Sequence, residues 1–126
     1  MSKLGDALTT TLKAAGDLSA AQFKVMKISG VNTVTTNDSA TGKVIGILLD
    51  KPAAAGEGAE IAYFGPTKAI IGSGGCTAGD LLGPDASGTL VVKTTDKDQV
   101  IGKALVTAVA GDVADVLLTG VAWLGA

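Results

Sequence analysis

A short apolar run that occurs twice constrains this chain more than any other feature. The run Val44-Ile45-Gly46-Ile47-Leu48 returns as Val100-Ile101-Gly102-Lys103-Ala104, and the two valines are 100 − 44 = 56 residues apart. β-Branched residues between turn-forming segments are typical of a strand that is buried on both faces. A glycine inside a strand weakens it unless another backbone or ring passes close by. We therefore expect Gly46 and Gly102 to be structural glycines in one packing arrangement that is used twice.

The repeat continues beyond these runs. Each is followed by a turn rich in alanine and glycine that carries an acid, and then by a second strand, which opens as Ala59-Glu60-Ile61 or Ala114-Asp115-Val116. Two units predict a pseudo-duplicated β domain, since repeat arrays usually need three or more. The composition agrees, because 18 glycines suit many tight turns and only 3% of the residues are aromatic. We expect a mainly β fold: a compact sandwich or barrel built from two pseudo-repeated halves.

The 126 residues leave room for one domain and short extensions. We expect an N-terminal arm over residues 1–17, a β domain over residues 18–118 and an apolar C-terminal tail over residues 119–126. These two extensions carry the candidate contact residues outside the β domain.

The arm has a weak apolar stripe. Leu4, Leu8 and Leu12 recur at helical spacing, with Lys3 beside them, but glycine and a run of threonines lower the helix propensity. We expect either an arm that orders only on a partner or a frayed terminus. In the first case these four residues are the predicted partner contact.

The tail holds the single tryptophan, Trp123, and no charged side chain. Tryptophan is enriched at binding hot spots, although it also serves as core. With Tyr63 and Phe64, it is a candidate for a subunit interface. A positive mean hydropathy also predicts some apolar surface that meets a partner.

Charge and segment composition exclude several classes of protein. The net charge is −2 and the ten basic residues are scattered, which argues against a nucleic-acid surface. No apolar run approaches the roughly 18 residues that a membrane span needs. The N-terminus has no long apolar region of a secretory signal, and one cysteine cannot form an internal disulfide. Folding in a reducing cytoplasm is the simple interpretation.

The chain lacks the usual groups of catalytic and metal sites. It has no histidine, which removes Ser-His-Asp and Cys-His nucleophiles, and Cys76 has no evident activating base. The glycine-rich segment 72–80 matches neither phosphate-loop motif, because no lysine follows Gly79 and Thr77 stands where a third glycine is needed. The acids near turns suit capping better than acid–base chemistry. We predict no enzyme, no cofactor and no metal.

Several motifs, taken in order, resemble those of tailed-bacteriophage capsid decoration (cement) proteins. They are the Ala-Gln-Phe segment that ends at Phe23, the first Val-Ile-Gly run, the Ala-Glu-Ile strand opening, Ala78-Gly79-Asp80-Leu81-Leu82 and the second Val-Ile-Gly run. The resemblance covers roughly residues 17–118. Lambda-type head decoration protein is similar only around its Val-Gly-Ile-Leu strand.

This resemblance implies a β-clip or β-tulip domain on the outer surface of a phage head. The partner would be the major capsid protein, and the protein would stabilise the expanded head. Many relatives are homotrimers, while others bind as monomers or dimers. It also implies synthesis in the host bacterial cytoplasm and a final place in the virion.

Two other functions stay open at the level of sequence. One is a small β-clip-like module that binds a carbohydrate or a peptide, which predicts a concave site with exposed aromatic side chains. The other is a carrier domain or small enzyme. Lys27 in Val25-Met26-Lys27-Ile28 superficially resembles an attachment lysine for biotin or lipoate, although it lies in the first strand of the β domain rather than at a mid-domain turn.

Overall fold

The chain folds into nine strands, as described by a computed structural model over residues 7–124. No helix occurs in that range, and hence none long and apolar enough to cross a membrane. The strands are β1 (Leu8–Ala14), β2 (Val25–Gly30), β3 (Thr33–Thr36), β4 (Val44–Leu48), β5 (Gly58–Ile70), β6 (Leu81–Pro84), β7 (Leu90–Val92), β8 (Gln99–Ala104) and β9 (Val113–Trp123).

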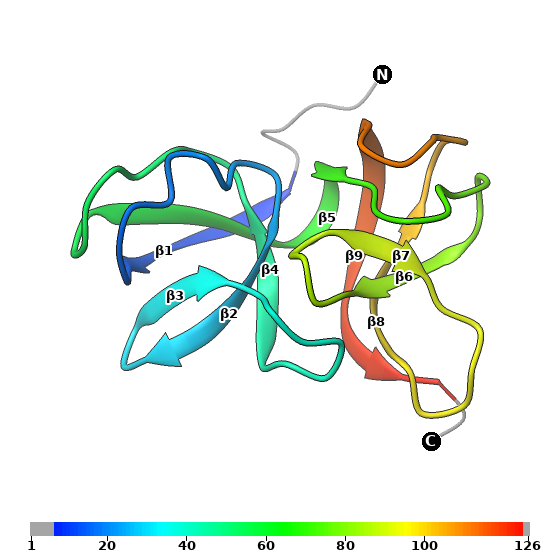
Figure 1. Ribbon diagram of the computed structural model, residues 1–126, viewed down its shortest axis with the longest axis horizontal. Helices are drawn as coiled ribbons and strands as arrows, with labels where there is room; N and C mark the ends of the chain where they lie inside the picture. Colours follow the sequence, from blue (N-terminus) through cyan, green and yellow to red (C-terminus); the bar gives the residue numbers. More distant parts are fainter. Residues whose placement is uncertain (1–6, 125–126) are drawn as a thin grey trace.

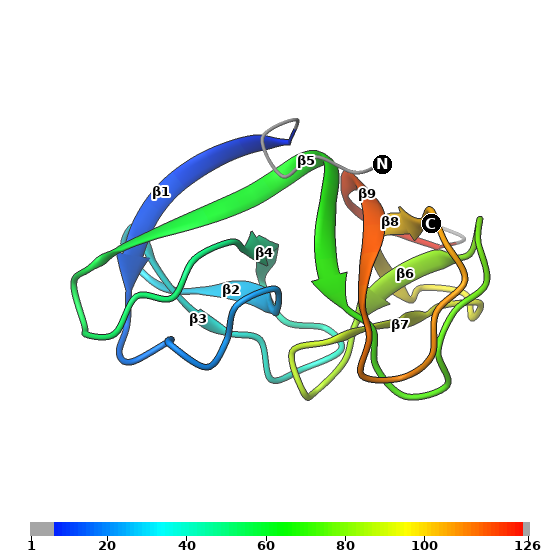
Figure 2. The same ribbon diagram turned by 90° about the horizontal axis from the view of Figure 1, so that it is seen from above.

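These strands form two lobes that share β5 (Figures 1 and 2). The strand order is β1-β3-β2-β4-β5-β9-β8-β6-β7, and an additional β1–β5 pairing closes the first five strands into a barrel. The second lobe runs from β5 through β9, β8 and β6 to β7, and only a bridge between Ile71 and Leu90 links its ends. Figure 2 shows β5 crossing from one lobe to the other and bending sharply between them.

The pairing register shows that the two lobes are copies. Met26 pairs with Gly46 in the first lobe and Leu82 pairs with Gly102 in the second, so both partners move by the same 56 residues. The first half of β5 corresponds to β9, and its second half corresponds to β1. Even the bridge from Ile71 to Leu90 repeats a parallel pair, Ala14 with Val34. The prediction of a mainly β fold from two pseudo-repeated halves is confirmed.

The two repeated glycines occupy the same position in their lobes. A Cβ added to Gly46 would collide with the carbonyl oxygen of Ala62 on β5, and one added to Gly102 would collide with that of Leu117 on β9. Because Ala62 and Leu117 are themselves equivalent in the repeat, both glycines permit the same close approach of two neighbouring strands. At Gly46 and at Gly102 there is therefore no room for a side chain.

Alternate residues of the first-lobe strands face two different cores. Met26, Leu48 and Ile61 pack inside the first barrel, where they meet residues such as Val34 and Leu18. Their sequence neighbours Val25, Ile47 and Ala62 belong instead to a core shared with the second lobe. The period of two in a strand explains this division. Strand β4 is therefore covered on both faces, as its apolar run predicts.

The N-terminal arm is a wrong prediction for residues 8–14. These residues are strand β1, which pairs antiparallel with β5 and parallel with β3, and they close the first barrel. Leu12 is half-buried against the inner core, opposite Ala59. The threonines favour a strand, and a distant partner supplies the hydrogen bonds. Lys3 and Leu4 lie outside the described residues.

The C-terminal tail is likewise wrong as a separate segment. Strand β9 continues through Trp123 and pairs there with β8, Gln99 with Trp123 and Val100 with Ala122. The dipeptide Gly65-Pro66 is of a type that favours turns. In the structure it is a bend inside the continuous strand β5, where Gly65 adopts a φ of 101°.

Candidate interaction surfaces

Exposed apolar side chains gather where the two lobes meet. We define the junction face as Leu8 on β1, Tyr63 and Phe64 on β5, and Val121 and Trp123 on β9, all of which are exposed. Leu8 and Phe64 are cross-strand partners, and Tyr63 and Val121 line the same groove. Trp123 lies two residues beyond Val121 and so points to the same side of β9. Strands β1, β5 and β9 thus each contribute exposed apolar side chains near the junction of the two lobes.

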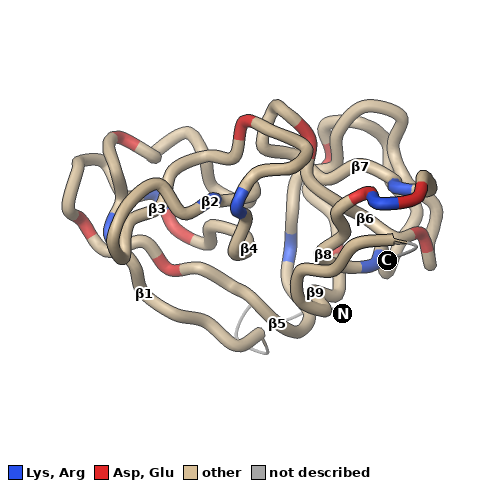
Figure 3. Tube along the Cα trace, turned by 90° about the horizontal axis from the view of Figure 1, so that it is seen from below, with Lys and Arg blue, Asp and Glu red and all other residues tan. Residues whose placement is uncertain are grey.

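The groove in the junction face contains no charged side chain. It has a volume of about 460 Å³ and is lined by residues of β1, β4, β5 and the end of β9, namely Thr10, Val44, Ile45, Tyr63, Gly120 and Val121. The charged residues lie elsewhere, and the trace of β9 toward the C-terminus carries none of them (Figure 3). This surface is suited to burial against another apolar surface rather than to binding a charged ligand.

One edge of β9 is open beside this groove. The β5–β9 ladder ends at the pair Gly65 with Leu118. Beyond Leu118, within residues 7–124, β9 pairs only with β8, and no ladder forms along its other edge, although β4 lies close to β9 and lines the same groove. An unpaired edge presents main-chain donors and acceptors to any strand that approaches it.

A second apolar surface lies at the β8–β9 loop, on the other side of the molecule from the bend of β5 (Figure 2). This loop, residues 105–111, carries no charge, and Leu105, Val106 and Val109 are exposed. The corresponding loop of the first lobe contains Asp50 and Lys51. Polarity at this position therefore differs between the two copies.

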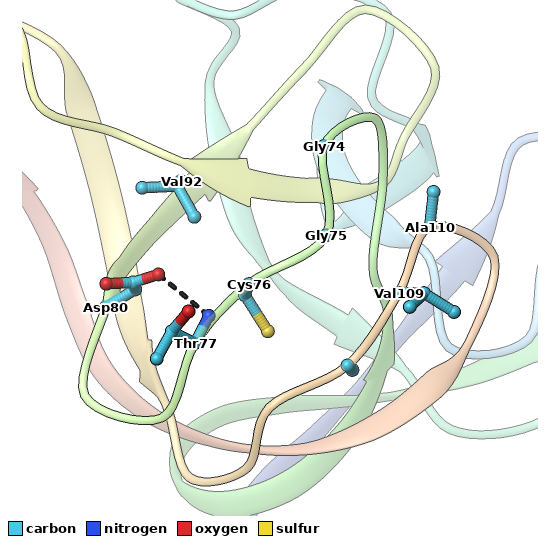
Figure 4. Close-up of a pocket in the computed structure, with 9 residues that line it drawn as sticks. Gly74, Gly75, Cys76, Thr77, Asp80, Val92, Val109 and Ala110 are labelled. Atoms are coloured by element: carbon cyan, nitrogen blue, oxygen red, sulfur yellow. Dashed lines mark hydrogen bonds between the residues drawn. The ribbon is translucent and has the colours of Figure 1, made fainter.

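Cys76 lies behind this loop and beside a cavity of about 280 Å³ (Figure 4). Its thiol donates a hydrogen bond to the carbonyl of Val106 at 3.5 Å. Burial raises the pKa of the thiol, and the charges of Asp80 and Asp112 act in the same direction. A thiol with a raised pKa is a poor nucleophile, because the reactive form is the thiolate. Cys76 therefore behaves as a small core residue.

Three of the acids near turns cap backbone amides. Glu57 accepts a hydrogen bond from Ala53 N, Asp80 from Thr77 N and Asp112 from Val109 N, at 2.7–3.2 Å. The Asp80 bond is the dashed line in Figure 4. The predicted capping role is confirmed for these three acids, whereas Asp115, for which it was also predicted, forms an ion pair with Lys68 instead. Over residues 7–124 no three Asp, Glu or Cys side chains are grouped as metal ligands would be.

The residues predicted for a subunit interface and the predicted attachment lysine lie in different parts of the structure. Tyr63, Phe64 and Trp123, predicted for a subunit interface, lie with Leu8 on the junction face. Lys27 forms an ion pair with Asp38 at 2.8 Å. Sequence reasoning missed Val121 and the uncharged loop after β8. Comparing that loop with its charged counterpart would have found it, because the repeat aligns the two loops.

Comparisons with known proteins bear on the fold. No protein-family model matches the sequence, and no curated protein matches it. The structure is similar to the crystal structure of the N base of head fiber gp8.5 in bacteriophage phi29, with a TM-score of 0.65 and 14% sequence identity. The match covers 89% of this chain and 93% of that one. The similarity therefore extends over both lobes and establishes a shared all-β fold of two fused halves.

Proposed function

We propose that this chain is a structural protein of a bacteriophage head, which binds the outer surface of the major capsid protein lattice and stabilises the expanded shell. The observation that carries the proposal is the likeness in fold, over both lobes, to the base of a phage head fiber. The ordered motifs that resemble capsid decoration proteins support it independently, because they come from the sequence. The proposal places the protein in the virion after synthesis in the host cytoplasm.

Binding to the assembled lattice would stabilise it without any chemical reaction. A ligand that binds only the assembled state contributes about 2.7 kcal/mol per site when its concentration is 100 times Kd. Repeated over many sites, this term opposes the outward force of packaged DNA. The function needs an apolar contact surface on a continuous folded body, and the two lobes, which share strand β5, are consistent with that need.

We propose the β8–β9 loop, with Val106 and Val109, as the surface that meets the shell. It is uncharged and exposed, whereas the same loop of the first lobe is charged. Lys3 and Leu4 remain candidates for a further contact with the shell. We also propose that the protein is a homo-oligomer, with a trimer as the favoured form.

The test uses expanded heads that lack the protein. Purified protein added to them should bind at a fixed copy number and raise the temperature at which the heads melt in calorimetry. Val109→Asp should weaken binding, whereas Ala54→Asp, at the equivalent exposed position of the first lobe, should not. Deleting residues 2–6 tests Lys3 and Leu4 and leaves β1 in place. Absence of binding to expanded heads would refute the proposal.

The alternative binding module has a separate test. The groove offers one aromatic side chain, Tyr63, and two hydroxyl groups, those of Tyr63 and Thr10, which is little for a sugar. A hit on a glycan or peptide array that Tyr63→Ala abolishes would favour the module over the capsid role. For the carrier alternative, an intact mass above that of the sequence, with the adduct on Lys27, would be the signature.

A further inference from the structure

We propose that the cavity behind the β8–β9 loop binds a lysine or arginine side chain of the major capsid protein. The inference rests on the proposed function, in which the same loop meets the shell. It adds to that surface a pocket with Asp80 at one end. It also names the chemistry of the partner residue, which the exposed side chains Val106 and Val109 do not.

The cavity combines apolar walls with one acidic end. Figure 4 shows Asp80 and Val92 on one side of Cys76 and Val109 on the other. A volume of about 280 Å³ is ample for a long side chain, since a cavity of about 150 Å³ already holds a benzene molecule. Lysine and arginine bury an aliphatic stem along apolar surface and keep the charged group at a polar end. Both therefore match the walls and the end of this cavity.

Two negative charges act at the cavity. Asp80 accepts the hydrogen bond from Thr77 N through Oδ2, and Asp112 accepts that from Val109 N through its own Oδ2. Within residues 7–124 neither acid forms a salt bridge, and both raise the pKa of the Cys76 thiol. A cleft lined by charge of one sign favours a guest of the opposite sign. The cavity therefore suits a cationic side chain better than a neutral one.

The first lobe has a larger side chain at the place of Cys76. Leu18 N donates a hydrogen bond to the carbonyl of Pro52 at 2.8 Å, as Cys76 N donates to the carbonyl of Ala108 at 2.9 Å. Pro52 and Ala108 are equivalent in the repeat, being 108 − 52 = 56 residues apart. A buried leucine thus occupies the place that the smaller cysteine takes in the second lobe.

The charge changes at the same time as the space. The carbonyl of Lys24 accepts a hydrogen bond from Leu48 N in the first lobe, and that of Asp80 accepts one from Ala104 N in the second. These pairs are equivalent in the repeat, so a lysine in one copy stands where the other copy has an aspartate. The smaller side chain and the negative charge both belong to the lobe that carries the uncharged loop.

The test compares full-chain variants for binding to expanded heads that lack the protein. Asp80→Asn removes the charge, while the asparagine oxygen can still accept the bond from Thr77 N. It should raise the dissociation constant at least about tenfold, because a charge-assisted hydrogen bond to the shell is lost. Asp80→Lys, the first-lobe residue, should weaken binding further by repulsion. Added salt should weaken the wild type more than Asp80→Asn.

Cys76→Leu tests the space without changing the charge. It places the first-lobe side chain in the cavity, so it should weaken binding by a similar factor. Circular dichroism and thermal unfolding show whether this variant folds. If it does not fold, the comparison of Asp80→Asn with the wild type at low and high salt decides the matter.

The matched control is Asp98→Asn. Asp98 is half-buried like Asp80, and its Oδ2 accepts a hydrogen bond from Thr95 N, three residues earlier, in the same way. It precedes β8, whereas the loop at the cavity follows β8, so the two acids lie at opposite ends of that strand. This variant should bind heads as the wild type does.

Three results would overturn the inference while the proposed function stands. One is a wild type that binds heads with an affinity that Asp80→Asn does not change. Another is equal salt dependence of the wild type and Asp80→Asn. The third is an equal loss with Asp98→Asn, which would indicate a general effect of net charge. Failure of the proposed function is a different result, because in that case the wild type itself does not bind expanded heads.

Discussion

The first lobe is a closed barrel and the second is an open copy of it. The β1–β5 ladder of the first lobe has its counterpart in the β5–β9 ladder of the second. The remaining gap is closed by two β1–β3 pairs in the first lobe and by one bridge in the second. The two lobes therefore share one arrangement of strands but differ in which surfaces they leave exposed. The closed copy buries its own inner core, and the open copy leaves an edge of β9 and an apolar loop exposed. The two lobes therefore differ most at the exposed edge of β9 and at the uncharged β8–β9 loop.

The largest expected effect concerns the two glycines at which the lobes are most alike. Gly46→Ala and Gly102→Ala each drive a Cβ into a carbonyl oxygen of the adjacent strand. We expect each to reduce the free energy of unfolding by about 3 kcal/mol or more, because strands in a packed barrel cannot move apart freely. Chemical denaturation measures this loss.

The control for the glycines is Gly16→Ala, where no atom lies within 4 Å of the added Cβ. This change should alter stability by no more than about 0.5 kcal/mol. If Gly102→Ala were as mild as the control while Gly46→Ala were severe, the two crossings would not be equivalent.

The difference in closure predicts a difference in local opening. Amide hydrogens of β7 (Leu90–Val92) should exchange at least about tenfold faster than those of β3 (Thr33–Thr36), because a single bridge holds the edge of the second lobe. Hydrogen exchange followed by NMR gives both sets in one experiment. Equal protection would mean that the second lobe is as firmly closed as the first.

A smaller effect concerns an ion pair that only one lobe has. Lys68 and Asp115 are cross-strand partners, 2.6 Å apart between Nζ and Oδ1, and the equivalent positions hold Thr11 and Glu60. Lys68→Met should cost about 0.5–1 kcal/mol, since the pair is only partly exposed.

Thr11→Lys should create the missing pair and add up to about 0.5 kcal/mol. Combining it with Glu60→Gln should remove that gain, as thermal unfolding would show. A gain that survives the second change would come from something other than the ion pair.

The smallest effect is a titration. A hydrogen bond from Lys27, together with its charge, lowers the pKa of Asp38 from its ordinary 3.8, and bonds from Ser19 lower that of Asp17. A lowered pKa means that the folded state favours the ionised carboxylate. Any stabilisation of the folded state by these bonds is therefore present above pH 3.8, the ordinary pKa, and is lost as the pH falls through the lowered pKa. Lys27→Met should return the pKa of Asp38 toward 3.8 and leave Asp17 unchanged, as NMR titration would show.

The sequence predicts the repeated parts of the fold and misses the parts that close it. The Val-Ile-Gly runs indicate two strands and a duplication, and their glycines indicate that a neighbouring strand comes close. These properties can be predicted because the order of apolar residues and the position of a glycine are local features of the sequence. Strand β1 is missed because its partner, Ala59 opposite Leu12, lies 59 − 12 = 47 residues away. The run of threonines counts against a helix but does not by itself identify a strand's partner.

The junction face could be predicted only in part. Tyr63, Phe64 and Trp123 stand out as rare aromatic residues in an aliphatic chain. Their meeting with Leu8 and Val121 depends on the bend of β5 and on where β9 ends, which are tertiary properties. Gly65-Pro66 reads as the end of a strand, since proline usually interrupts one, yet here the ladder with β9 continues past it.

The shared strand β5 means that no linker separates the two halves. A protease that cuts between Phe64 and Pro66 would cut a strand that belongs to both lobes, and neither fragment would retain a complete sheet. A mechanical load applied to one lobe is likewise carried into the other along a single backbone. If the proposed role on a phage head is correct, the shell would therefore meet one continuous body rather than two domains that move independently.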